Sequence, residues 1–140
     1  MPTSETPKWQ VKLTASNGRL KDECNYFGAS RSSTERIESP GCLENYVDLS
    51  FTTDQGGAYA TDLRGNLSGG DSWQFVVETD RAGEIVLEWD DLKNVPSSAN
   101  LALVDLAENR SMTITPGGSY RFRADEGGLT RSFRIDYQSR

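Results

Sequence analysis

The sequence contains no histidine and two cysteines among its 140 residues, and both shortages exclude chemistry. Without histidine, Ser-His-Asp and Cys-His arrangements cannot form, and the commonest general base near neutral pH is missing. Structural zinc sites normally use four cysteine or histidine ligands, so a zinc site of this kind is excluded as well.

Paired carboxylates remain as candidates for acid–base catalysis, because glycosidases use two such groups across a cleft. Adjacent acids occur at Asp22–Glu23, Asp90–Asp91 and Asp125–Glu126. These pairs fall at expected turns, and neighbouring residues of a strand point to opposite faces of a sheet. We interpret them as solvated surface acids and expect a protein that is not an enzyme.

Long apolar runs and positive charge are also scarce. No apolar run approaches the roughly 20 residues that a membrane-spanning helix needs, so we expect no membrane insertion. The chain has 15 basic and 21 acidic residues, a formal net charge of −6. Nucleic-acid-binding domains usually carry a basic patch or stripe, so we expect no nucleic-acid partner.

The two cysteines, Cys24 and Cys42, bracket the polar stretch "CNYFGASRSSTERIESPGC". A disulfide, a metal pair and two free thiols are the alternatives. A metal pair lacks further ligands, and the spacing is not the C-x-x-C of a redox pair, so we favour the disulfide. Closing a loop of this size contributes about 3 kcal/mol in the chain-entropy model. Because disulfides persist in oxidising compartments, the pair predicts a secreted or cell-surface protein.

Alternation of apolar and polar residues with a period of two is the strongest pattern present, and it marks strands with one buried face. Short polar turns, mostly with glycine, separate the later runs. We expect roughly eight or nine short strands around one core. The apolar positions of these runs are Trp9, Val11, Leu13, Val47, Leu49, Phe51, Trp73, Phe75, Val77, Ile85, Leu87, Trp89, Leu101, Leu103, Met112, Ile114, Tyr120, Phe122, Phe133, Ile135 and Tyr137.

These features predict an all-β fold, a single antiparallel β-sandwich of Ig or fibronectin type III type over residues 9–138, after a disordered tail over 1–8. Residues 17–45 show no such alternation and are interpreted as one long loop that the disulfide staples. We place the three tryptophans in the core, and within it we expect Trp73, Phe75, Trp89, Leu103, Phe122 and Phe133 to share one cluster.

The stretch 84–137 resembles the fibronectin type III or Ig-like accessory modules near the C-terminus of large secreted or surface-anchored bacterial proteins. The resembling features are strands at Ile85–Trp89 and Leu101–Asp105 and a final hairpin with Tyr120–Phe122 and Phe133–Ile135. The resemblance implies a non-catalytic module. Its partners would be neighbouring domains of a larger secreted protein, or an extracellular protein or glycan. The cysteine pair departs from the family pattern.

Aromatic residues on the expected loop or near strand ends are candidate ligand platforms. Tyr26, Tyr46 and Tyr59 are the residues we single out, and Phe27 is expected to be similarly free of the core. The alternative is that these rings cover the edge of the sandwich.

Asp22, Glu23 and Asn25 are candidates for a calcium site, because Ca²⁺ takes six to eight oxygen ligands and often fixes loops of extracellular domains. No D-x-D-x-D-G loop is present, so we favour ordinary surface acids and expect no cofactor. Asp62 and Arg64 lie two residues apart, on one face of a strand, where a structural ion pair is natural.

We therefore predict a non-catalytic extracellular module that acts as a structural spacer or interaction domain of a secreted or cell-surface protein. The alternatives are a carbohydrate-binding module of a secreted hydrolase and a subunit of an extracellular filament. We expect the interaction surface on the loop face formed by residues 22–46 and Gln55–Tyr59, because loops at the end of a sandwich carry recognition.

Overall fold

The computed structural model describes residues 9–30, 34–38, 46–53, 56–65, 70–90, 92, 95–97 and 99–139. The tail expected over 1–8 lies outside the described residues, as does Cys42. The described strands are β1 (Trp9–Asn17), β2 (Leu20–Ala29), β3 (Glu35–Glu38), β4 (Val47–Thr52), β5 (Tyr59–Arg64), β6 (Gly70–Thr79), β7 (Gly83–Asp90), β8 (Ala99–Asp105), β9 (Arg110–Thr113), β10 (Ser119–Ala124) and β11 (Leu129–Ser139).

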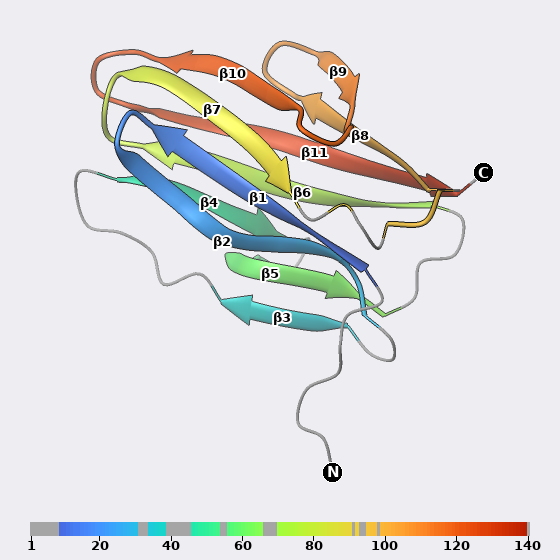
Figure 1. Ribbon diagram of the computed structural model, residues 1–140. Coiled ribbons are helices and arrows are strands. Elements are labelled where there is room, and N and C mark those ends of the chain that lie inside the picture. Colours follow the sequence, from blue (N-terminus) through green and yellow to red (C-terminus); the bar gives the residue numbers. More distant parts are fainter. Residues whose placement is uncertain are drawn as a thin grey trace.

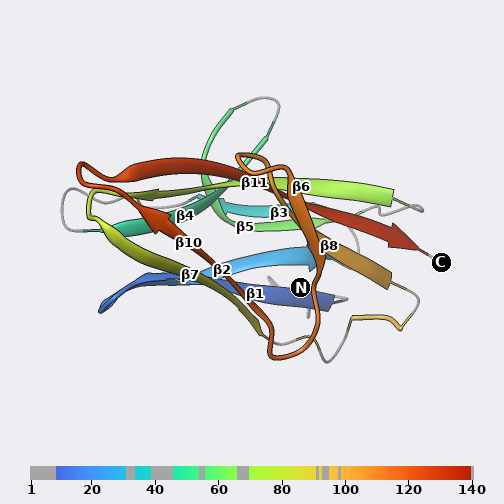
Figure 2. The same cartoon turned by 90° about the horizontal axis from the view of Figure 1, so that it is seen from above.

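These strands form one 11-stranded sheet in the order β10–β7–β1–β2–β5–β4–β6–β11–β8–β9, with β3 paired to β5 (Figure 1). The β2–β5 pair is parallel, so the sheet is mixed. The sheet curls into a half-barrel. Seen from above, β6 and β11 lie on one side and β1, β2 and β7 on the other (Figure 2). Among the described residues there is no helix with the length and apolar character that crossing a membrane requires.

The predicted two-sheet antiparallel sandwich with eight or nine strands is wrong. In the structure, the strands expected in two separate sheets are joined by backbone hydrogen bonds, because β2 pairs with β1 on one edge and with β5 on the other. From β5 the sheet continues to β4 through the pair Phe51 and Tyr59, and from β4 to β6. One continuous curled sheet therefore replaces the expected pair of sheets.

The predicted long loop over 17–45 is wrong as well, since β2 and β3 lie within it. Gly28, in β2, shows how closely β1 and β2 approach: a Cβ there would lie 2.3 Å from the carbonyl oxygen of Trp9, and its φ is +153°. Only glycine tolerates that combination of space and backbone conformation.

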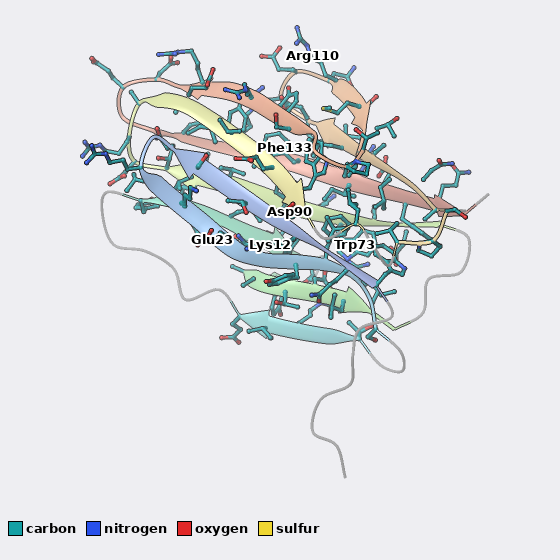
Figure 3. All side chains as sticks on the ribbon, in the orientation of Figure 1. Lys12, Glu23, Trp73, Asp90, Arg110 and Phe133 are labelled. Atoms are coloured by element: carbon teal, nitrogen blue, oxygen red, sulfur yellow. The ribbon has the colours of Figure 1, made fainter. Side chains whose placement is uncertain are left out.

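The core occupies the inside of the curl and holds the apolar residues of the alternating runs (Figure 3). The Phe75 and Phe133 rings stack with centroids 5.1 Å apart, and Phe27 lies 5.1 Å from Trp73. The three tryptophans are buried as predicted, whereas the expectation that Phe27 is free of the core is wrong. The six residues predicted to share one cluster all belong to it: Trp73, Phe75, Trp89, Leu103, Phe122 and Phe133.

Candidate functional site

A polar cleft of about 320 Å³ opens beside β5, where β3 and the end of β4 lie near the start of β6. Guanidinium, carboxylate, hydroxyl and amide groups line it, which makes it rich in both hydrogen-bond donors and acceptors. We refer to this site as the polar cleft; its lining residues are Arg36, Thr52, Thr53, Arg64, Asp71, Ser72 and Gln74.

A buried carboxylate, that of Asp62 in β5, organises one wall of the polar cleft. Its side chain is 0% exposed and accepts hydrogen bonds from Arg64 Nε at 3.1 Å and Arg64 Nη2 at 3.0 Å. Arg36 Nε, from β3, donates to the same carboxylate at 3.0 Å. The predicted ion pair between Asp62 and Arg64 is thus confirmed, and its two-point geometry is the strong form of this contact.

Arg64 is held from three directions. Besides Asp62, its Nη1 donates to Asp71 Oδ1 at 3.0 Å, and its guanidinium lies 5.4 Å from the ring centroid of Trp73. Trp73 itself is fixed, because its Nε1 donates to the carbonyl oxygen of Asp62 at 3.0 Å. Burial alone would lower the pKa of Arg64, but the hydrogen bonds to Asp62 raise it above its ordinary value. Arg64 is therefore a permanently charged, rigid part of the wall.

Arg36 is fixed at its Nε, whereas the described residues do not fix its terminal amino groups in this way. Its Nε binds Asp62, and its guanidinium lies 5.8 Å from the ring centroid of Tyr59. Within the described ranges its terminal amino groups have no hydrogen-bond partner, and the side chain is 35% exposed. Arg36 therefore presents oriented N–H donors to whatever enters the polar cleft.

The three candidate tyrosines do not come together in one site. Tyr59 does not line the polar cleft, but its ring contacts Arg36, which does, and it also lies close to Gly57: a Cβ on Gly57 would be 2.8 Å from the Tyr59 hydroxyl. Tyr46 precedes β4 at the opposite end of that strand and donates to Glu78 Oε2 at 3.0 Å, and this hydrogen bond raises its pKa. Tyr26 is half-buried in the middle of β2. Their role in ligand binding stays a prediction.

Two of the three calcium candidates, Asp22 and Asn25, have hydrogen-bond partners within the fold. Asp22 Oδ2 accepts a hydrogen bond from the backbone N–H of Leu49 at 2.7 Å, and Asp22 Oδ1 accepts from Asn25 Nδ2 at 3.0 Å. Asn25 also donates to the carbonyl oxygen of Leu13, next to an irregularity in the β1–β2 pairing. These contacts join β2 to β4, while Glu23 is exposed. In the described part of the chain no cluster of acidic, cysteine or histidine side chains could hold a metal ion.

The predicted disulfide cannot be placed, because Cys42 lies outside the described residues and only the backbone of Cys24 is described, in β2. The pairing stays a prediction. The interaction surface predicted over 22–46 and Gln55–Tyr59 is not a loop face, since much of it is strand. One residue of it, Arg36, does line the polar cleft, and Tyr59 contacts Arg36.

Together these observations define an all-β protein with a polar cleft whose wall is ordered by hydrogen bonds and ion pairs. Comparison with protein-family models, curated proteins and solved structures found no match for the chain. These comparisons therefore give no support to the resemblance to fibronectin type III or Ig-like modules. The single curled sheet also differs from the two-sheet sandwich of such modules.

Proposed function

We propose that this chain is a non-catalytic interaction module of a secreted or cell-surface protein, and that it binds a saccharide in the polar cleft. Arg36 carries the proposal, because its Nε is fixed by buried Asp62 while its side chain lines the polar cleft. Donors that are already ordered before binding lose little conformational entropy when the ligand arrives.

The charge balance of the polar cleft favours a neutral, hydroxyl-rich ligand. The two guanidiniums of Arg36 and Arg64 lie against the two carboxylates of Asp62 and Asp71, so the wall has no net charge to attract a simple ion. The remaining lining residues add hydroxyl and amide groups. Sugar hydroxyls both donate and accept hydrogen bonds, which matches this mixture.

The pKa shifts of Asp105 and Tyr120, two residues outside the polar cleft, do not favour an acid–base role for either group. Burial alone would raise the pKa of Asp105, but hydrogen bonds from Arg131 and Tyr120 hold it below its ordinary value. Burial, followed by the hydrogen bond to Asp105, raises the pKa of Tyr120. Both pKa values are shifted further from neutral pH than the ordinary values of these groups. A general acid or base works best with a pKa near the operating pH.

The secreted location rests on the proposed bond between Cys24 and Cys42. The intact mass of freshly purified protein should increase by the mass of two hydrogen atoms when reductant is added, because reduction converts one disulfide into two thiols. Two free thiols in the non-reduced sample would contradict both the bond and the inferred compartment.

The test of saccharide binding is isothermal titration calorimetry against a panel of neutral oligosaccharides, the hexaoses of glucose, xylose and mannose. We expect saturable binding of at least one of them. The Arg36→Ala variant should weaken that binding about tenfold or more, which corresponds to about 1.4 kcal/mol.

The matched control is Arg123→Ala, which removes an exposed arginine from β10 that does not line the polar cleft. We expect this variant to bind like the wild type. If the wild type binds no member of the panel, or if Arg36→Ala binds as tightly as the wild type, a structural spacer is the better account.

A further inference from the structure

The two ends of the curled sheet, β10 and β8–β9, face each other across a slot of about 260 Å³. Four arginines line it from three strands: Arg110 from β9, Arg121 and Arg123 from β10, and Arg131 from β11. We call it the arginine slot. One lining residue, Glu108, is acidic. This is a concentration of positive charge on a chain whose formal net charge is −6.

Arg131 forms the fixed floor of the arginine slot. Its Nε donates to Asp105 Oδ1 at 3.1 Å and its Nη2 donates to Asp105 Oδ2, and that carboxylate is 1% exposed. The guanidinium lies over the ring of Phe122, 4.8 Å from its centroid. Asp105 also accepts hydrogen bonds from the Tyr120 hydroxyl and the backbone N–H of Ala107. Arg131 is therefore paired with buried Asp105, and its Nη2 also lies 3.6 Å from Oε1 of Glu108, so the charge it adds to the slot is largely compensated.

The other three arginines contribute positive charge to the open side of the arginine slot. Arg110 and Arg123 are exposed, and within the described part of the chain neither forms an ion pair or a side-chain hydrogen bond. Arg110 lies at the outer rim of the fold, at β9 (Figure 3). Arg121 pairs with Glu84 at 2.8 Å, but both side chains are about half exposed, and such pairs contribute little in water.

We infer that the arginine slot binds a tetrahedral oxyanion, a sulfate or phosphate group. Guanidinium groups give two-point hydrogen bonds to such oxyanions and stay charged at all working pH values. Donors that come from three strands surround a volume rather than a plane, which suits a tetrahedral group better than a flat carboxylate. The inference concerns residues other than those of the polar cleft, so it is independent of saccharide binding there.

The experiment is a nuclear magnetic resonance titration of the ¹⁵N-labelled chain, observing backbone amides and arginine Nε–H groups. The probes are sodium sulfate, sodium phosphate, glucose 6-sulfate and sodium acetate, each against sodium chloride at the same ionic strength. We expect saturable shifts confined to the arginine slot for the tetrahedral probes. The Arg110→Ala and Arg123→Ala variants should each weaken binding severalfold, and Arg36→Ala should leave it unchanged.

The probes also separate the sources of the oxyanion. Tighter binding of glucose 6-sulfate than of inorganic sulfate assigns a sulfated glycan, whereas tighter binding of inorganic phosphate assigns the free ion; either result supports the inference. Shifts that chloride or acetate reproduce equally, or an affinity that neither arginine variant changes, overturn it. Because Arg110 and Arg123 are exposed, their variants should keep the urea midpoint of the wild type, and the wild-type shift map stands independently of them.

Discussion

Replacing Asp62 with alanine should destabilise the fold far more than replacing Arg36, one of its two arginine partners. Breaking a buried ion pair by deleting one member costs about 3–5 kcal/mol, because the remaining charge is left without compensation. In Asp62→Ala, Arg64 keeps Asp71 and is 18% exposed, so it regains some solvation. We therefore expect a loss near the lower end of that range, about 3 kcal/mol.

The matched comparison is Arg36→Ala, in which Asp62 keeps both hydrogen bonds from Arg64. Arg36 is 35% exposed, so we expect a loss of about 1 kcal/mol or less, as for partly solvated pairs. Arg121→Ala, from the exposed pair with Glu84, should cost still less. Urea unfolding followed by tryptophan fluorescence measures all three, because the tryptophans are buried.

Two outcomes would refute this reasoning. One is an Asp62→Ala variant with nearly the stability of the wild type, which would mean that the carboxylate does not hold the wall of the polar cleft. The other is an Arg36→Ala variant that loses as much stability as Asp62→Ala, which would make Arg36 a structural residue rather than a donor kept for a ligand.

Two further predictions concern the opposite side of the core. Phe133 is 0% exposed and stacks on Phe75, so Phe133→Ala should cost about 3–5 kcal/mol in urea unfolding; an unchanged midpoint would place the core elsewhere. Because the folded state holds the pKa of Asp105 below its ordinary value of 3.8, Asp105 contributes stability above that pH and loses it as the pH falls further. Thermal unfolding from neutral to acid pH should therefore show a smaller fall of the melting temperature in Asp105→Asn than in the wild type. Melting temperatures that fall in parallel with pH in the two proteins would contradict the role of Arg131.

Alternating apolar residues predicted most of the strands correctly, since β1, β4, β6, β7, β8, β10 and β11 each bury, fully or partly, the residues that the pattern selects. The same pattern missed β2, because its inward positions include Asn25, a buried polar residue satisfied by hydrogen bonds from within the fold. It missed β3 because that strand is short and mostly charged. Polar residues that satisfy one another across strands leave no trace in hydrophobic periodicity.

The arrangement of the strands was not predictable in the same way. Alternation specifies which face of a strand is buried, and a two-sheet sandwich and a single curled sheet both satisfy it. The difference lies in the parallel pairing of β2 with β5, which joins residues far apart in the sequence. The polar cleft shows the same limit: Asp62 and Arg64 are two residues apart and their ion pair was predicted, whereas Arg36 reaches Asp62 from another strand.

Whether the polar cleft binds a saccharide can be read from a chemical-shift map. The ¹⁵N-labelled wild type is titrated with the neutral hexaoses of glucose, xylose and mannose, observing backbone amides and arginine Nε–H groups. We predict saturable shifts at Thr52, Ser72 and Gln74 and at the Nε–H of Arg36, with the amides of β9 and β10 unchanged. Shifts that map away from the polar cleft, or no shift with any member of the panel, would contradict saccharide binding in the polar cleft.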